Sequence, residues 1–426
     1  MSQFSRRSLS SGPTARGTRM FGQKVLALIL AGGKGSRLGA LTAHRAKPAL
    51  TFGGTYRLID FALSNCVHSG LSDVWVIEEY EVHSLNDHLG GGRPWDLDRT
   101  HGGLQVLPPY KGGAAGAGGF ASGNADAIHL HANLIREYAP DVLLVLSADH
   151  IYKLDYGPVI ERHLQTGAGV TMVTTTLPQG EDATRFGNVT TFKNGRVKRF
   201  DYKPEKPTSD QITTEVFVYD APKLLATLDR IAAEKKGARQ KDAGKKEDPD
   251  AAHLGDFGDE LIPNLVKAGE AYAYALGGYW LDVGLPGAYW QAHQDLLSGA
   301  SVPLDDPEWP VLSSSVPRMP ARLDAGADVD ASLIAYGCHV QGRVRRSVLA
   351  PGVRVEPGAV VEDAVLLRDV TVRAGGVVRR AIVDEASEIS GTVDGGRGQV
   401  AVIPARTRLK VGQRVTGAPR QEEGGN

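Results

Sequence analysis

The stretch from Leu26 to Lys47 constrains the fold of this chain more than any other part of the sequence. An aliphatic run, LALILA, ends in Gly32-Gly33-Lys34-Gly35, and Arg37 and the segment Arg45-Ala46-Lys47-Pro48 follow. The run has the continuous apolar character of a buried parallel strand. Glycines directly after such a strand permit a tight turn whose N–H groups approach phosphate oxygens, and Arg37 and Lys47 add positive charge. The stretch therefore indicates chemistry on the phosphates of a nucleotide.

Apolar strands alternate with amphipathic helices from Val25 to about Ala300, which is typical of a mostly parallel sheet flanked by helices. We predict strands at residues 74–77, 141–146 and 170–175 and a helix at 125–138. In such sheets ligands bind at the carboxyl ends of the strands. Because the glycine-rich loop and Asp149 each follow a strand directly, we expect them to share one site.

The pattern changes to that of a solenoid after Pro310. β-Branched residues recur near every sixth position from Val329 to Ile389, with Pro-Gly and Gly-Gly pairs between them. A single coil cannot bury its apolar face, so several coils must stack. We predict a parallel β-helix of the hexapeptide type, with an ordinary β-sandwich as the alternative, and an extra strand pair from Gly391 onward.

The first motif and the segments after it resemble the sugar-phosphate nucleotidyltransferases, and within them the bacterial glucose-1-phosphate adenylyltransferase family. Phe52-Gly53-Gly54 and the run from Tyr56 to Cys66 carry the resemblance first. The later motifs are Gly123-Asn124-Ala125-Asp126-Ala127, Asp149-His150-Ile151-Tyr152-Lys153, Asp256-Phe257-Gly258 and Tyr279-Trp280-Leu281-Asp282-Val283-Gly284. The resemblance covers about residues 25–384 and implies a Rossmann-like nucleotidyltransferase domain followed by a left-handed parallel β-helix.

We expect four segments on this basis. They are a disordered tail at residues 1–20, the catalytic domain at 21–300, a linker at 301–328 and the β-helix domain at 329–415. Within the catalytic domain, residues 112–119 are predicted to form a mobile loop and residues 230–250 a solvated, partly disordered insertion.

The resemblance implies transfer of the adenylyl group of ATP to α-D-glucose 1-phosphate, giving ADP-glucose and pyrophosphate for glycogen or another α-glucan. Two anions must approach each other, so the catalyst needs a metal, cations and positioned N–H groups more than an acid–base pair. Mg²⁺ prefers carboxylate and phosphate oxygens. The resemblance implies Asp149 and Asp282 as its ligands.

The predicted nucleotide site lies around the same loop. Arg37 is expected at the β- and γ-phosphates and Lys47 at the α-phosphate or the sugar phosphate. The other predicted nucleotide-binding residues are Ala31, Gly32, Gly33, Gly35, Gly123 and Asp126.

Sugar-side positions depart from the family pattern. Lys203 matches the lysine that binds the sugar phosphate, although a second Glu-Lys-Pro at 205–207 competes for this alignment. Tyr202 then stands where the family has a glutamate for sugar hydroxyls, and Glu215 stands where it has a glycine. We expect Glu215 to replace the missing acid, with a Glu215 that faces solvent or pairs with a nearby lysine as the alternative. The other predicted substrate residues are Thr213 and Trp280.

The resemblance also implies a sugar-phosphate effector bound between the two domains, and a homotetramer. The predicted effector residues are His44, Arg45, Arg379 and Arg380, with His44 in place of the family's usual lysine.

Composition excludes several classes of protein. Net charge is −1, with 48 basic and 49 acidic residues, which argues against a nucleic-acid or anionic-membrane partner. No apolar run reaches the ~18 residues that a membrane span requires. Cys66 and Cys338 are expected to be reduced thiols in a cytoplasmic protein.

Two alternatives remain open. One is a relative that uses another base or another sugar 1-phosphate, because Leu107-Pro108-Pro109-Tyr110 lacks the glutamine that recognises adenine in the family. The other is a regulatory subunit of low activity, for which Ala148, Tyr202 and Leu281 argue. The retained residues Arg37, Lys47, Asp149 and Asp282 argue against a regulatory subunit.

Overall fold

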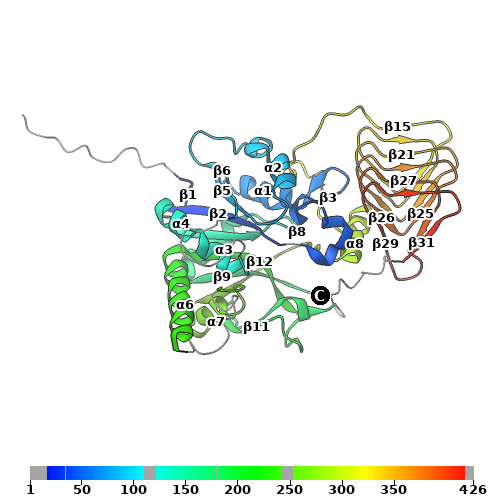
Figure 1. Cartoon of the computed structure of the whole chain (residues 1–426). Helices are drawn as coiled ribbons and strands as arrows, with labels where there is room; N and C mark the ends of the chain where they lie inside the picture. Colours follow the sequence, from blue (N-terminus) through cyan, green and yellow to red (C-terminus); the bar gives the residue numbers. More distant parts are fainter. Residues whose placement is uncertain (1–16, 34, 110–120, 179–180, 242–252, 418–426) are drawn as a thin grey trace, which may run out of the picture.

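The chain folds into an α/β domain and a three-sided β-helix that lie side by side (Figure 1). The structure, a computed structural model, describes residues 17–33, 35–109, 121–178, 181–241 and 253–417. Most of the predicted tail and all of the loop predicted at 112–119 lie outside the described residues.

Parallel strands form the centre of the α/β domain. Strand β2 (Gln23–Ala31) lies between β5 (Asp73–Glu78) and β7 (Val142–Ser147) and runs parallel to both. Strand β6 (Gly103–Leu107) pairs in parallel with β5, and β12 (Gln211–Asp220) pairs antiparallel with β7. This arrangement confirms the mostly parallel sheet, with the antiparallel strands on one side of it.

The remaining strands of the sheet extend beyond β12. They are β9 (Val170–Thr176), β10 (Gly187–Thr191), β11 (Val197–Tyr202) and β13 (Ala271–Ala275), while β1 (Arg19–Met20) pairs with β2. Two short ribbons lie outside the sheet, β3 (Thr51–Phe52) with β4 (Tyr56–Arg57) and β8 (His150–Tyr152) with β14 (Trp280–Asp282).

Helices cover both faces of the sheet. They are α1 (Leu58–His68), α2 (Val82–Leu89), α3 (Asn124–Leu130), α4 (Ala132–Tyr138), α5 (Tyr156–Thr166), α6 (Ala221–Lys241), α7 (Leu261–Lys267) and α8 (Pro286–Ser298). Short 3₁₀ segments are η1 (Ser36–Thr42), η2 (Lys47–Ala49), η3 (Gly90–Trp95) and η4 (Ala183–Arg185).

The side-chain alternation along β2 explains the two apolar layers. Val25, Ala27 and Ile29 pack in one cluster with residues of α1, α2 and α5, whereas Leu26 and Leu28 pack in the other with residues of α3, α4 and α6. A strand covered on both faces must be apolar throughout, which is the pattern of LALILA. None of the helices within the described ranges is long and apolar enough to cross a membrane.

Two local predictions differ from the structure. The helix predicted at 125–138 is broken at His131 into α3 and α4. The insertion predicted to be solvated and partly disordered continues α6 as far as Lys241, and the rest of it lies outside the described residues. Its Ala, Glu, Lys and Arg residues are good helix formers, which accounts for the extension.

The C-terminal domain is a left-handed parallel β-helix whose three sides are sheets of very short strands. One side consists of β15 (Arg322–Leu323), β18 (His339–Val340), β21 (Arg354–Val355), β24 (Thr371–Val372), β27 (Glu388–Ile389) and β30 (Arg408–Leu409). The second consists of β16 (Asp328–Asp330), β19 (Arg343–Arg345), β22 (Val360–Glu362), β25 (Val377–Arg379), β28 (Thr392–Asp394) and β31 (Arg414–Thr416). The third consists of β17 (Leu333–Ile334), β20 (Val348–Leu349), β23 (Val365–Leu366), β26 (Ala381–Val383) and β29 (Ala401–Ile403).

Stacked valines fill the interior of the β-helix. Val344, Val361, Val378 and Val393 occupy matching register positions on successive strands and are all fully buried. The first strand begins at Arg322, ahead of the predicted start at 329. The segment after Gly391 was predicted to form an extra strand pair, but β28 to β31 continue the coils of the solenoid instead.

Helix α8 joins the two domains. The indole N–H of Trp290 donates to the carbonyl oxygen of Asp363 at 2.7 Å, and the guanidinium of Arg380 lies 4.3 Å from the Trp290 ring centroid. Phe52 and Tyr289 of the α/β domain pack in one apolar cluster with side chains of the third β-helix sheet. This buried contact positions the β-helix against the α/β domain.

Candidate active site

Two separate strand ends bring Asp149 and Asp282 together. Asp149 lies two residues beyond Ser147, the last residue of β7, and Asp282 ends β14. In the antiparallel β8–β14 ribbon, Asp282 pairs with His150, the residue next to Asp149. The two carboxylates therefore lie side by side at the carboxyl edge of the sheet, where such folds bind ligands.

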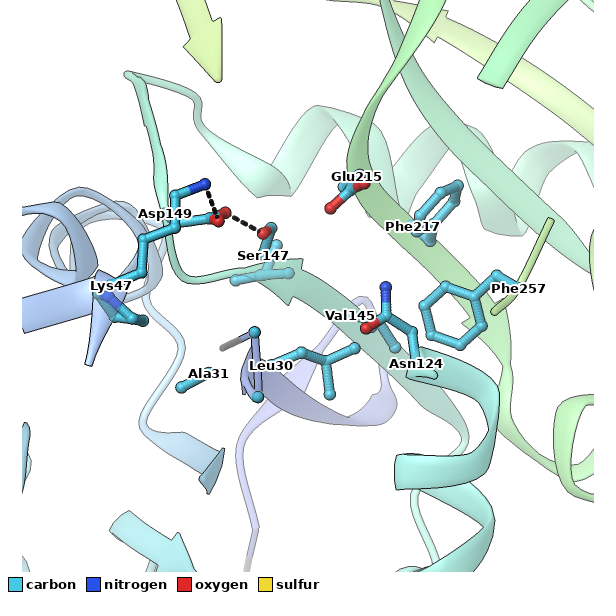
Figure 2. A pocket seen from close by; sticks show the side chains of 14 residues that line it. Leu30, Ala31, Lys47, Asn124, Val145, Ser147, Asp149, Glu215, Phe217 and Phe257 are labelled. Carbon is cyan, nitrogen blue, oxygen red and sulfur yellow. Dashed lines mark hydrogen bonds and ion pairs between the residues drawn. The ribbon is translucent and has the colours of Figure 1, made fainter. Parts of the chain in front are cut away.

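Lys47 lies between these carboxylates. Its buried Nζ is 2.5 Å from Oδ2 of Asp149 and 3.2 Å from Oδ1 of Asp282. Burial opposes the charged form of Lys47, but the two carboxylates outweigh it and raise the pKa of the ammonium group. Burial likewise opposes ionisation of Asp149, yet Lys47, His150 and Ser147 together hold the pKa of Asp149 well below its usual range. Figure 2 shows the contacts of Asp149 with Lys47 and Ser147.

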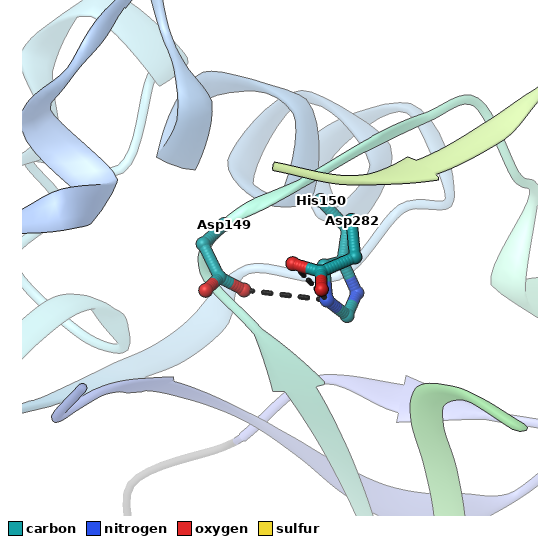
Figure 3. A group of neighbouring side chains, drawn as sticks. All are labelled: Asp149, His150 and Asp282. Carbon is teal, nitrogen blue, oxygen red and sulfur yellow. Dashed lines mark ion pairs between the residues drawn. The ribbon is translucent and has the colours of Figure 1, made fainter. Parts of the chain in front are cut away.

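The same carboxylates and His150 form the candidate metal site drawn in Figure 3. One ligand atom from each of the three residues lies within 4.8 Å of the others. His150 Nδ1 is 3.1 Å from the carbonyl oxygen of Thr214, so this nitrogen donates and Nε2 faces the carboxylates. Two carboxylates whose shared ion-pair partner is Lys47 make a donor set that fits a hard divalent cation.

The glycine-rich loop lines the same cavity. Ala31, Gly32 and Gly33 border it together with Lys47 and Asp149. Gly35 has a φ of +65°, and a side chain there would also approach Thr42 and Lys47 closely. Both constraints favour glycine at this position.

Arg37 lies near Asp282 of the candidate metal site. Both side chains border Gly284. A Cβ atom at this position would lie 3.4 Å from Nη2 of Arg37 and 2.9 Å from Oδ2 of Asp282. Arg37 is exposed. Its guanidinium is therefore near Asp282 and accessible to an anionic ligand.

The predicted sugar side adjoins this cavity. Glu215, Phe217, Asn124 and Phe257 line both the cavity at Asp149 and a second hollow that contains Tyr202, Lys203 and Thr213. The Tyr202 hydroxyl donates to Asp256 Oδ2 at 2.5 Å, and Lys203 Nζ lies 3.3 Å from the same oxygen. Burial and the Asp256 charge raise the pKa of Tyr202, so its phenol stays protonated and donates.

Glu215 stands where the two hollows meet. Its carboxylate faces the cavity between Asp149 and Phe217 (Figure 2). The expectation that Glu215 lines the pocket is met by this geometry, and the solvent-facing alternative is not. Burial raises the pKa of its carboxyl group.

Three predicted residues have other surroundings. Gly123 lines a third hollow, with Gly32, Gly33 and Glu79, that continues the cleft. Asp126 is buried, and its carboxylate accepts hydrogen bonds from Ser122, His253 and Leu254, so it braces the start of α3. Trp280 packs edge-on against His150 at 5.1 Å rather than lining the cavity.

Two of the four predicted effector residues, Arg45 and Arg380, contact the other domain. Arg45 donates to Asp384 at 2.7 Å and lies 3.8 Å from Glu385. Arg379 pairs with Glu362, Arg380 stacks on Trp290, and His44 is exposed. The positive charges of Arg45 and Arg379 are thus already balanced by acidic residues of the β-helix.

Sequence reasoning missed two residues of the site. His150 was quoted only as part of a motif, and Asp256 was not assigned a role. The position of His150 next to Asp149 is the signal from which its place in the site could have been predicted. No local signal indicates that Asp256 contacts Tyr202 and Lys203, because 54 positions separate Asp256 from Tyr202.

Comparisons with known proteins agree with this site. Residues 26–299 match the nucleotidyl transferase family model, and residues 320–399 match the GlmU-like C-terminal hexapeptide model. The chain therefore belongs to the nucleotidyl transferases.

Similar curated proteins narrow the class. A glucose-1-phosphate adenylyltransferase of Acetivibrio thermocellus is 35% identical over 384 residues, covering 89% of this chain and 85% of the relative. Proteins of the same name from Clostridium acetobutylicum and Bacillus cytotoxicus are each 39% identical and are covered over 83% and 92% of their lengths. The chain is a member of the glucose-1-phosphate adenylyltransferase family, which confirms the resemblance seen in its motifs.

Proposed function

We propose that this chain transfers the adenylyl group of ATP to α-D-glucose 1-phosphate, releasing pyrophosphate and forming ADP-glucose for glycogen or another α-glucan. The observation that supports this most directly is the Lys47–Asp149–Asp282 cluster beside the loop at the end of β2. Such a cluster binds two phosphate-bearing substrates and needs no general base, since the attacking phosphate oxygen is already ionised.

In this reaction a phosphate oxygen of the sugar 1-phosphate forms a bond to the α-phosphorus of ATP, and the bond between the α-phosphorus and the bridging oxygen breaks. Arg37 neutralises the β- and γ-phosphates that leave together as pyrophosphate. Lys47 neutralises the α-phosphate and the attacking phosphate, while Ala31, Gly32, Gly33 and Gly35 supply the loop backbone. Asp149 and Asp282 would hold Mg²⁺, which when bound supplies further positive charge to the phosphates.

On the sugar side, Lys203 is proposed to bind the phosphate and Glu215 to accept hydrogen bonds from sugar hydroxyls. Tyr202 and Thr213 shape the same hollow. Trp280 supports it indirectly through His150. Gly123 belongs to the nucleotide side in this proposal, and Asp126 positions it by holding the start of α3.

A second candidate function is transfer to another base or another sugar 1-phosphate. The phenol of Tyr202 and the carboxylate of Glu215 in the sugar-side hollow favour it. A regulatory subunit of low activity is disfavoured because Lys47, Asp149 and Asp282 are assembled in one cluster.

Regulation and assembly are also proposals. We propose a sugar-phosphate effector site around His44, Arg45, Arg379 and Arg380, a homotetramer, and a cytoplasmic location. We also propose the division into a catalytic domain at 21–300, a linker and a β-helix that ends at about residue 415, with the first coil starting at Arg322 and not at 329.

The test is a pyrophosphate-release assay on the purified full chain with Mg²⁺, crossing four nucleoside triphosphates with several sugar 1-phosphates. The proposal requires the highest kcat/KM for ATP among the nucleotides and clear turnover with glucose 1-phosphate. A preference for another nucleotide would favour the second candidate. Release that appears only after mixing with a related active subunit would favour the regulatory alternative.

A further inference from the structure

Glu215 differs from the other carboxylates of the cleft in its partners. Asp149 and Asp282 share the ammonium group of Lys47, and Asp256 accepts from both Tyr202 and Lys203. Within the described residues, Glu215 makes neither a side-chain hydrogen bond nor an ion pair. Glu215 is partly buried and lines the cleft, so its carboxylate is open to a ligand that brings a cation.

The backbone holds Glu215 in an unusual conformation. Its φ is +55°, a left-handed value that costs a residue with a Cβ about 1 kcal/mol or more. The pairing of β12 with β9 shifts register between Thr213 and Phe217, so the residue lies at an irregularity in the strand. The irregularity lies beside the cleft, and the Glu215 side chain faces into it (Figure 2).

The charged groups around Glu215 leave it without a matched cation. Those that act on its carboxyl group are His150, Asp149, Asp282 and Lys203. Lys203 is paired with Asp256, and His150 is directed by its Nδ1 contact to Thr214 and faces the Asp149–Asp282 pair. The local balance is therefore acidic, and burial raises the pKa of Glu215.

We propose that Glu215 selects a sugar 1-phosphate that carries a protonated amine, and that an amino-sugar 1-phosphate is a substrate of this enzyme. The inference rests on the proposed nucleotidyl transfer. Glu215 and Lys203 line one hollow, so a ligand whose phosphate lies at Lys203 can present an ammonium group to Glu215. An ammonium group and a hydroxyl can both donate to an ionised carboxylate, but the ammonium group adds the attraction between two opposite full charges.

The chemical step is the same as for a neutral sugar. A phosphate oxygen of the amino-sugar 1-phosphate forms the bond to the α-phosphorus of ATP, the α–β phosphoanhydride breaks, and pyrophosphate leaves. The amine stays protonated and does not react. Its contribution is to binding and orientation alone.

The experiment measures kcat/KM for glucosamine 1-phosphate and for glucose 1-phosphate, with ATP and Mg²⁺, in the wild-type full chain and in Glu215→Gln and Glu215→Gly. N-Acetylglucosamine 1-phosphate serves as the control with a neutral amide in place of the amine. We expect wild type to use glucosamine 1-phosphate and to discriminate against the amide. The ratio of kcat/KM for the amine over the hydroxyl sugar should fall about ten-fold or more in both variants.

Glycine accepts the left-handed backbone of this position, so Glu215→Gly is expected to fold even if Glu215→Gln is destabilised. Turnover of glucose 1-phosphate without glucosamine 1-phosphate in wild type would overturn the inference, as would an unchanged ratio in the variants. If no sugar phosphate releases pyrophosphate, the proposed function fails. Calorimetric binding of the two sugar phosphates then tests the selection by Glu215 alone: a preference for the amine that is lost in Glu215→Gln supports this selection, and equal binding refutes it.

Discussion

The ammonium group of Lys47 lies 2.5 Å from Oδ2 of Asp149. This ion pair joins the segment after the glycine-rich loop to the end of β7. Because the same ammonium group also contacts Asp282, one cation holds both carboxylates at the edge of the sheet. In the proposed function, this is the place where the two substrate phosphates meet.

Replacing either carboxylate should reduce turnover strongly. Asp149→Asn and Asp282→Asn each remove a metal-ligand charge, and the loss of about 3 kcal/mol of transition-state stabilisation corresponds to roughly a 100-fold lower kcat. Pyrophosphate release at saturating substrate measures the effect. Asp201→Asn, on the exposed ion pair with Arg199, is the matched control and should be near wild type. Wild-type turnover in Asp149→Asn or Asp282→Asn would refute the assignment.

Removal of divalent metal should abolish activity reversibly. Carboxylate oxygens of Asp149 and Asp282 bind hard cations, and Mg²⁺ suits a site shared with phosphate oxygens. Dialysis against a chelator followed by titration with Mg²⁺ should restore full turnover in wild type. Asp282→Asn should require a higher Mg²⁺ concentration for its residual activity. Full activity in the chelated enzyme would contradict the metal site.

Lys203→Gln should raise KM for the sugar phosphate about ten-fold or more with little change in KM for ATP, because it removes one charged contact to the sugar phosphate. Lys206→Gln is the control, since Lys206 belongs to the competing Glu-Lys-Pro and is exposed. Steady-state kinetics with each substrate varied separately distinguish the two lysines. A larger effect of Lys206→Gln would show that the other alignment is correct.

Acid should destabilise the fold through His293. This side chain is fully buried, its Nδ1 lies 2.8 Å from the carbonyl oxygen of Tyr289, and its Nε2 accepts from the Gly53 N–H. Burial lowers the pKa of His293 from 6.5 to about 4. Between these values the unfolded chain binds the proton and the folded chain does not, so stability falls as the pH falls from 6.5 to about 4.

The loss from His293 is on the order of 3 kcal/mol if the whole shift is expressed. The free energy of unfolding in urea, measured across this pH range, should depend less on pH in His293→Gln than in wild type. The exposed His83→Gln should leave the slope unchanged. An identical slope in His293→Gln would show that other groups control acid lability.

The β-helix should mediate a homotetramer. Large apolar side chains are exposed on and before its first coil, including Val316 at 69%, Met319 at 80% and Leu323 at 53%. Open coil ends and exposed apolar side chains need cover. Light scattering after size exclusion should give about four times the 45.4 kDa mass of the chain. A monomer at micromolar concentration would contradict the proposal.

Local pattern was sufficient for the strands that carry the site. The apolar runs that became β2 and β7 are buried on both faces, and such runs are recognisable without knowledge of their neighbours. The residues directly after them, including Gly32 and Asp149, follow at fixed short distances along the chain. The sequence placed the glycine-rich loop and Asp149 at one edge of the sheet for this reason, while their roles with phosphate and metal stay predictions. The secondary structure of charge-rich segments was harder to predict. The helical extension of α6 to Lys241 was therefore missed.

The sequence by itself determined the class of fold, the stacked valines of the β-helix and the residue types available for phosphate chemistry. Only the tertiary structure decided that Lys47 bridges Asp149 and Asp282, that Tyr202 and Lys203 share Asp256, and that Glu215 faces the cleft. The physical reason is that local propensity and burial pattern act over a few residues. Each of these contacts joins segments that are distant in the sequence. The distances between the contacting side chains depend on the position of β12 in the sheet and on how the β8–β14 ribbon packs against it.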